Sequence, residues 1–130
     1  MDWYYQLFTL MNYFTDALNK YAVFTGRASR RQYWMFVLVN FLISFAIGLI
    51  GGLLKKNSEL GFGFTLSDFY NFAMFIPSLA IAVRRMHDVE RSGWILLIPI
   101  YNLVVACMPG TKGPNKYGAD PTETQVMVTK

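Results

Sequence analysis

The sequence predicts an all-α protein that is embedded in a membrane. The strongest observation is an uncharged run from Tyr33 to Leu54. As a helix this run spans roughly 33 Å, enough to cross a hydrocarbon core of about 30 Å. Because lipid offers no hydrogen bonds to the backbone, the run should form one continuous helix. A second apolar segment and arginines grouped beside both segments are typical of the same class.

Composition limits the domain count and the class of partner. With 130 residues, 54% of them apolar and 17% aromatic, the chain allows a single membrane domain over residues 1–130. The formal net charge is +4, but the basic residues flank apolar segments, which argues against nucleic-acid binding. Cys107 is the single cysteine and cannot form an intrachain disulfide. No secretory signal peptide is recognised, because the first apolar run starts only after residue 32, is too long for the apolar region of a signal peptide and lacks a small-x-small cleavage site.

Residues 2–21 are expected to form an amphipathic helix. Apolar residues recur at steps of three and four from Trp3 to Tyr21, and Gln6 and Asn12 lie on the opposite face. Such a helix can pack on the protein's own membrane helices or lie in the headgroup plane, held by its aromatic residues. The many Trp and Tyr residues favour the interfacial position, and the two arrangements are compatible.

Two membrane helices are predicted next. The first covers residues 30–54 and begins at a capping box, in which Ser29 caps the helix and Gln32 reaches back to it. The second covers residues 66–85. Pro77 should kink it, with Ser78 as a candidate to satisfy one freed backbone group.

A third segment over residues 92–108 has Ser92 as its candidate cap. Its apolar stretch from Trp94 to Met108 spans roughly 22 Å as a helix and contains Pro99, so it is either a short crossing or a re-entrant piece. Residues 109–130 are expected to form a turn-rich tail, rich in Gly and Pro.

Orientation is predicted from the Lys and Arg residues near the segments. A cytoplasmic N-terminus places seven of them inside and five outside if the third segment crosses. If that segment turns back at Pro99, the ratio becomes ten to two. We therefore predict a multi-pass protein of the inner (plasma) membrane with its N-terminus in the cytoplasm, and the side of the C-terminus stays open.

The basic residues are the candidate binding groups, because guanidinium groups match phosphate oxygens bidentately. The predicted sites for anionic lipid or a partner are Arg27, Arg30, Arg31, Arg84, Arg85 and Arg91.

His87 and Asp88 are expected to brace the turn after the second helix. A metal site is not expected, because His87 is the only histidine and a stable site needs three or four ligands. Acid–base catalysis by His87 and Asp88 is the enzymatic alternative.

Ser44, Gly48 and Gly52 form a ridge of small residues on the first membrane helix. Such ridges let helix backbones approach closely. The ridge is expected to pack against this protein's own second or third helix, or else to mediate homo-oligomerisation.

Three stretches together resemble a family of small bacterial inner-membrane proteins called domain of unknown function 805. They are Phe24–Trp34, Arg84–Asp88 with Arg91–Trp94, and Gly110–Gly118 running into Asp120 and Pro121. The resemblance covers most of the chain and implies no activity and no catalytic residues. It marks these signature positions: Gly26, Arg27, Arg30, Tyr33, Trp34, Arg85, His87, Asp88, Ser92, Gly93, Trp94, Asn115, Tyr117 and Gly118.

The function expected from the sequence is non-enzymatic binding of anionic lipid or a membrane protein partner through the basic cytoplasmic face. No cofactor and no metal are expected. The alternatives are an oligomeric transport or channel subunit and a lipid-modifying enzyme. The first membrane helix has no charged side chain after Arg31 and before Lys55, which argues against a conducting path.

Overall fold

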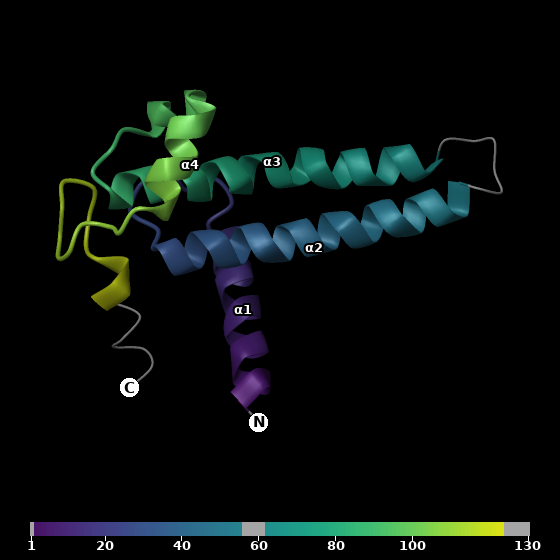
Figure 1. Ribbon diagram of the computed structural model, residues 1–130, viewed down its shortest axis with the longest axis horizontal. Helices are drawn as coiled ribbons and strands as arrows, with labels where there is room; N and C mark the ends of the chain where they lie inside the picture. The colour runs from purple at the N-terminus through teal and green to yellow at the C-terminus, as the bar shows by residue number, and fades with distance from the viewer. Residues whose placement is uncertain (1, 56–61, 124–130) are drawn as a thin grey trace.

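The computed structural model describes residues 2–55 and 62–123, and it is all-helical apart from one isolated β-bridge (Figure 1). Its elements in chain order are α1 (Asp2–Asn19), α2 (Arg30–Lys55), α3 (Phe62–Asp88), the 3-10 helix η1 (Gly93–Leu97) and α4 (Pro99–Cys107). The helices α2 and α3 lie side by side as a long hairpin. The other elements gather at the end of this hairpin where α2 begins and α3 ends, which we call the arginine end.

Both helices of the hairpin are long and apolar enough to cross a membrane. The candidate spans are Arg30–Leu54, with a mean hydropathy of 2.4, and Leu66–Asp88, with a mean hydropathy of 1.4. Within the pair, the Tyr70 hydroxyl donates to Asn40 Oδ1 at 2.9 Å. These polar side chains satisfy each other between the helices, as membrane helices require.

The predicted capping box is confirmed at the start of α2. The Ser29 hydroxyl accepts a hydrogen bond from the Gln32 amide at 3.2 Å, and Gln32 Oε1 accepts one from the Ser29 amide at 2.9 Å. These two bonds satisfy donors that the first helical turn would otherwise leave unpaired. The local sequence thus fixes where α2 begins and which way its first turn faces.

Pro77 lies buried within α3 and has no amide hydrogen, so the Ala73 carbonyl loses its helical partner. The Tyr21 hydroxyl donates to this carbonyl at 3.0 Å. The sequence suggested Ser78 for such a role, but at Ala73 the donor comes from the turn after α1. Pro77 therefore creates an acceptor that attaches the N-terminal region to the hairpin.

Helix α1 leaves the hairpin at a steep angle, with only its C-terminal part packed against it (Figure 1). Phe14 stacks on Phe36 of α2 with ring centroids 5.5 Å apart, and Ala17 is buried in the same apolar cluster. The first half of α1 carries exposed aromatic side chains, among them Trp3 at 66% and Tyr5 at 68% exposed. Packing thus fixes one end of α1 and leaves the aromatic end outside the protein core.

The third apolar segment is not one continuous helix. Ser92 caps η1, accepting a hydrogen bond from the Trp94 amide at 3.4 Å, and Pro99 then starts the separate nine-residue helix α4. A helix of nine residues rises only about 14 Å. Both ends of the segment lie at the arginine end, since Gly93 abuts Val83 and the Met108 carbonyl accepts from Arg85.

The predicted packing of the small-residue ridge against the protein's own helices is not found at its two glycines. Among the residues that the structure describes, a β-carbon added at Gly48 or Gly52 would meet nothing within 4 Å. Ser44 does contact a neighbouring helix, where its hydroxyl donates to Asn71 Oδ1 at 3.4 Å. The crossing of α2 and α3 brings Ser44 toward α3 and leaves the glycines of the ridge outside the contact.

Candidate functional site

The arginine end is organised around one buried carboxylate. Asp88 ends α3, and its two oxygens bind two different arginines. Arg27 donates from Nε to Asp88 Oδ1 at 2.9 Å, and Arg85 donates from Nη1 to Asp88 Oδ2. All three side chains are buried, and Arg85 has no exposed surface. We call Arg27, Arg85 and Asp88 the arginine cluster.

Arg85 joins the starts and ends of other segments to this cluster. Its Nη1 also donates to the Ala28 carbonyl at 3.3 Å, just before α2 begins. Its Nε donates to the Ala106 carbonyl at 3.3 Å, and its Nη2 donates to the Met108 carbonyl, both at the end of α4. One side chain thereby holds α2, α3 and α4 together. Asp88 supplies a counter-charge that Arg85 shares with Arg27, and each of the three nitrogens of Arg85 donates at least one hydrogen bond, which a buried cation needs.

Arg27 performs the equivalent task for the tail. Gly26 has a φ of +89°, a left-handed backbone that glycine adopts readily, and it precedes Arg27 in the turn. From this turn the guanidinium of Arg27 donates to three tail carbonyls: to Gly113 at 2.6 Å, to Gly118 at 3.4 Å and to Thr111. The tail is therefore fixed beside residues that lie far from it in sequence.

The tail also approaches the cluster through its glycines. A β-carbon at Gly110 would lie 1.9 Å from Asp88 Oδ2, so only glycine fits there without a shift. The Thr111 amide donates to the Asp88 carbonyl at 2.8 Å. Asn115 and Gly118 exchange two backbone hydrogen bonds, of 3.0 and 3.1 Å, which close a small turn, and Gly118 has a φ of +138°. Residues 115–118 thus form one turn of the tail.

His87 is held inside this assembly. Its ring stacks on Tyr117, with centroids 4.0 Å apart and planes 3° from parallel. Its Nδ1 lies 3.1 Å from the Gly26 carbonyl, which can only accept, so this contact assigns the proton to Nδ1. Asn115 donates to the His87 carbonyl at 3.1 Å. His87 thus links the tail turn to the turn before α2.

Arg84 is buried as well, but on a different face of α3. Its Nε donates to the Ala80 carbonyl at 3.4 Å, and its own carbonyl accepts from the Ala28 amide at 3.0 Å. Its Nη2 has no hydrogen-bond partner among the residues that the structure describes. Arg84 therefore contributes to the interior packing of the arginine end and is not available to the surface.

Asp120 closes the tail. Its carboxylate accepts hydrogen bonds from the amides of Gly113 and Thr122, both at 2.9 Å. Burial alone would raise the pKa of this carboxyl, but the two amides and the charge of Arg27 outweigh burial and lower the pKa below its ordinary value. Asp120 is therefore ionised at neutral pH and holds its loop by accepting backbone bonds.

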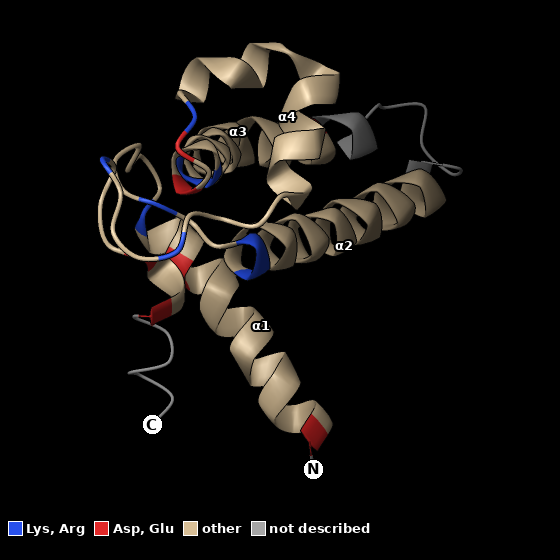
Figure 2. Cartoon of the chain, turned by 60° about the vertical axis from the view of Figure 1, so that its left-hand side comes forward, with Lys and Arg blue, Asp and Glu red and all other residues tan. Residues whose placement is uncertain are grey.

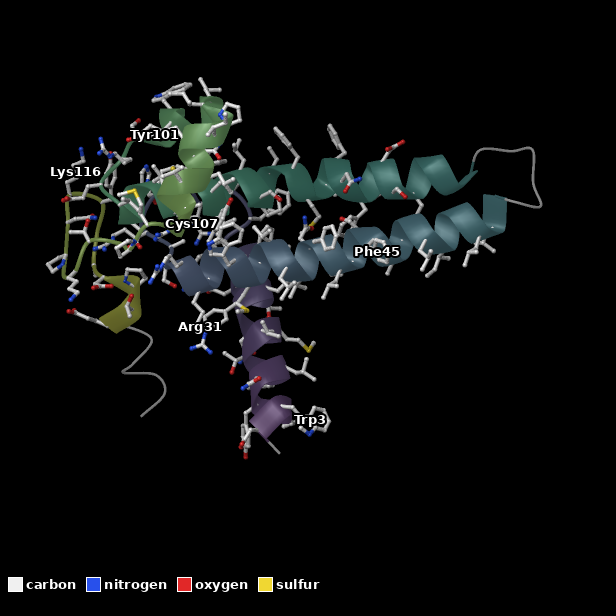
Figure 3. All side chains as sticks on the ribbon, viewed as in Figure 1. Trp3, Arg31, Phe45, Tyr101, Cys107 and Lys116 are labelled. Atoms are coloured by element: carbon white, nitrogen blue, oxygen red, sulfur yellow. The ribbon has the colours of Figure 1, made fainter. Side chains whose placement is uncertain are left out.

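A cleft of about 600 Å³ opens between α1, the start of α2 and the tail. Its lining residues are Thr9, Tyr13, Ser29, Arg30, Arg31, Asp88, Pro109, Gly110, Thr111, Lys112, Asp120 and Thr122. Arg30, Arg31 and Lys112 are exposed there, whereas both carboxylates are already engaged by the protein. Figure 3 shows Arg31 extending from the start of α2 into the space between α1 and the tail. We call this feature the basic cleft.

Two of the exposed arginines are positioned by contacts with neighbouring elements. Arg31 lies over the Tyr13 ring, 5.9 Å from its centroid, and Arg30 donates one hydrogen bond to the Cys107 carbonyl at 3.3 Å. A guanidinium carries five N–H donors, so both retain donors for an anion. The cleft also borders the N-terminus of α2, where the helix dipole is positive.

The six predicted binding arginines therefore separate into two groups. Arg30, Arg31 and Arg91 are exposed, but only Arg30 and Arg31 line the basic cleft, and Arg91 lies outside it. Arg27, Arg84 and Arg85 are buried, and the expectation that they face lipid phosphate is corrected, because the donors of Arg27 and Arg85 are used on the protein's own carbonyls and on Asp88. Trp94, a signature position, is 79% exposed and lies outside the cluster.

The sequence did not predict a binding role for Lys112 or Tyr13, and it marked Asp120 only as part of the third family motif. The tail was expected only to form turns, and no local pattern shows that Lys112 lies near the start of α2. The glycines at 110, 113 and 118 were the available signal, since closely spaced glycines in a polar segment indicate close backbone approach.

Comparison with known proteins identifies the family. The family model described as "Protein of unknown function (DUF805)" matches residues 21–119, which include the whole arginine cluster and all predicted signature positions. The chain belongs to the DUF805 family. The resemblance inferred from the three motifs is thus confirmed.

Two curated relatives come from Escherichia coli (strain K12). The chain is 38% identical to "Inner membrane protein YhaH" over 118 residues, covering 85% of this chain and 97% of the relative. It is 42% identical to "Inner membrane protein YhaI" over 118 residues, covering 85% and 96% respectively. No solved structure matches the chain. With two apolar helices and inner-membrane relatives, the predicted fold class, an all-α membrane protein, is confirmed.

Proposed function

We propose that the protein binds the phosphate-bearing headgroup of an anionic phospholipid in the basic cleft. The observation that carries this function is the convergence of Arg30, Arg31 and Lys112 on one cleft whose acidic residues are already engaged. Arginine forks match phosphate oxygens, and the adjacent helix N-terminus adds positive potential. The role is non-enzymatic: His87 and Asp88 serve as contacts that hold the turns and the tail.

A lipid is preferred over a free phosphate as the ligand, because the cleft lies at the depth where the membrane-spanning part of the hairpin begins. The cleft borders α1 and the start of α2, and Phe36, where α1 meets α2, lies roughly 9 Å along the helix from Arg30. The exposed apolar length of the hairpin begins at this level and continues away from the arginine end. A cleft at such a boundary adjoins the layer in which lipid phosphates are concentrated.

The charge distribution supports a cytoplasmic arginine end. Figure 2 shows most of the Lys and Arg residues of the described chain gathered at this end of the hairpin, whereas Lys55 ends α2 at the opposite end. The tail lies there too, because Arg27 and Asp88 bind its backbone. This arrangement corresponds to the ten-to-two ratio expected for a third segment that turns back, and it favours placing the N-terminal turn and the tail together in the cytoplasm.

The test is native mass spectrometry of the protein extracted with phosphatidylglycerol or cardiolipin. The variant Arg30→Gln/Arg31→Gln/Lys112→Gln should lose bound lipid, with an affinity about 100-fold lower at about 1 kcal/mol per basic residue. A control variant, Lys20→Gln/Arg91→Gln/Lys116→Gln, removes the same charge from exposed positions outside the cleft. This control should keep its lipid.

Two results would contradict the proposal. Equal lipid loss from both variants would mean that net charge alone attracts the lipid. Full retention by the cleft variant would mean that the cleft serves a protein partner or has no ligand. Inorganic phosphate added in excess distinguishes the source of the anion: displacement of lipid by phosphate would show a site for free phosphate, and persistence of the lipid is the expected result.

A further inference from the structure

The elements are distributed unevenly along the α2–α3 hairpin. Near the arginine end, α1 packs on α2 through Phe14 and Phe36, and α4 packs on α2 and α3 through Val105 and Ala106. Figures 1 and 2 show α1 and α4 leaving the hairpin on opposite sides, both at steep angles to it. Within the described residues, the other half of the hairpin has no further element beside it. The molecule is therefore wide at one end and narrow at the other.

The two lateral elements expose large apolar side chains. On α1 these are Trp3, Tyr4, Tyr5, Leu7, Phe8 and Met11, each at least half exposed. On η1 and α4 they are Trp94, Leu97, Ile98, Ile100, Leu103 and Val104, with Trp94 at 79% and Ile100 at 80%. The sequence from Ser92 to Met108 contains no charged residue. Neither surface can face water without a large unfavourable hydration free energy.

The hairpin identifies what covers these surfaces. Its exposed apolar length requires hydrocarbon around it, and α1 joins it at Phe36, near one end of that length. An amphipathic helix that lies across the spans at this level rests in the boundary between headgroups and acyl chains. Trp and Tyr side chains are enriched at that boundary. The η1–α4 segment is too short to cross, and both of its ends return to the arginine end, so it enters the same leaflet.

We infer that the protein is a membrane wedge, which occupies more area in the leaflet at its arginine end than in the opposite leaflet. Four helical segments displace lipid in the first leaflet and only two displace lipid in the second. Such a molecule fits best where the first leaflet is convex, because a convex leaflet has more area at the level of α1 and α4. The partner of these apolar faces is therefore a curved lipid bilayer, and the protein partitions toward that curvature.

Membrane tubes pulled from giant vesicles of phosphatidylcholine and phosphatidylglycerol test this inference. A dye attached at Lys116→Cys, after Cys107→Ser, reports the arginine end, and an impermeant quencher separates the two orientations. In a tube the outer leaflet is convex. Molecules with the arginine end outside should be enriched in the tube relative to the vesicle, and molecules with that end inside should be depleted.

The variant Leu7→Gln/Phe8→Gln/Met11→Gln removes apolar contact from α1 at three exposed positions. Its tube-to-vesicle ratio should fall toward one. The control Gln6→Ala/Asn12→Ala changes exposed residues of the polar face and should keep the enrichment. The same ratio for both orientations would overturn the inference. So would a dimer in native mass spectrometry that the α1 variant dissociates, because a second copy would then cover these faces.

Discussion

At the arginine end charged residues are buried, whereas along the rest of the hairpin large apolar residues are exposed. At the arginine end, the charged residues Arg85 and Asp88 are buried, with exposed fractions of 0% and 4%. Along the hairpin, Phe72 of α3 is 81% exposed and Phe45 of α2 is 60% exposed. In water, both the exposed apolar surface and the buried charges would raise the free energy of the folded state. Along the hairpin, the hydrocarbon of a membrane makes exposed apolar side chains favourable. At the arginine end, ion pairs and hydrogen bonds compensate for the burial of charge.

The difference shows how a small membrane protein obtains a defined tertiary structure. Lipid tails are as apolar as leucine, so burial of apolar surface gives the hairpin little energy to hold other elements. At the arginine end, directional bonds from guanidinium groups to carbonyls perform this task. They join the turn before α2, the end of α3, the end of α4 and the tail.

The largest effect is expected from Asp88→Asn, which removes the carboxylate that Arg27 and Arg85 share and leaves both guanidinium groups buried without their bonded counter-charge. Breaking a buried pair in this way typically costs about 3–5 kcal/mol. Thermal unfolding in detergent, followed by circular dichroism, should show a large drop in Tm. Glu90→Gln removes an exposed carboxylate two residues away and serves as the control. Equal Tm values for the two variants would mean that the cluster does not hold the fold.

A pair of glycine substitutions compares the two regions directly. Gly110→Ala forces a β-carbon against Asp88 and should destabilise the protein by about 1–3 kcal/mol. Gly48→Ala adds the same methyl group at a position where no described residue lies within 4 Å, and it should be neutral or stabilising by about 0.5–1 kcal/mol, since alanine favours helices. Denaturation of both variants measures the difference between their unfolding free energies. If Gly48→Ala destabilised the protein more than Gly110→Ala, Gly48 would lie in a packed interface, and the hairpin would not differ from the arginine end in this respect.

The bond from Tyr21 to Ala73 tests how a helix break attaches the N-terminal region to the hairpin. Tyr21→Phe should cost about 0.5–1.5 kcal/mol, and Tyr5→Phe, at a 68% exposed position, should cost less. In a Pro77→Ala background the Ala73 carbonyl regains an amide donor from its own helix. The effect of Tyr21→Phe should then shrink in a double-mutant cycle. Strict additivity would show that the hydroxyl does not act through this carbonyl.

The smallest effect concerns pH and is confined to the tail. The native pKa of Asp120 lies below its ordinary value of 3.8, so its stabilisation is fully present above that pH. It is lost as the pH falls through the lowered native pKa. The stability difference between the protein and Asp120→Asn should therefore be constant near neutral pH and narrow below about pH 4. A difference that widens on acidification would mean that the pKa is raised.

Local patterns predicted the elements whose determinants are local. The capping box of Ser29 and Gln32, the cap by Ser92 and the break at Pro99 could each be recognised within a few residues. They needed only hydrogen bonds between near neighbours. The family was recognisable for a related reason, because its motifs are contiguous stretches of sequence.

The roles of the arginines could not be predicted in this way. A basic residue beside an apolar segment has the same local pattern whether it faces lipid phosphate or the protein's own carbonyls. Arg27 and Asp88 are separated by 61 positions, and Arg27 and Gly113 by 86. Only the folded chain shows that Arg27 and Arg85 are internal while Arg30 and Arg31 line a cleft. Lys112 was missed for the same reason, because its place depends on how Arg27 holds the tail.

We propose that the arginine cluster holds the end of α3 and the tail on the same side of the membrane. Accessibility to an impermeant maleimide tests it, with single cysteines at Glu90, Lys116 or Leu54 after Cys107→Ser. Cysteines at Glu90 and Lys116 should label only in inside-out vesicles, and a cysteine at Leu54, near the far end of α2, should not label there. Labelling of Glu90→Cys and Lys116→Cys from opposite sides would contradict the account.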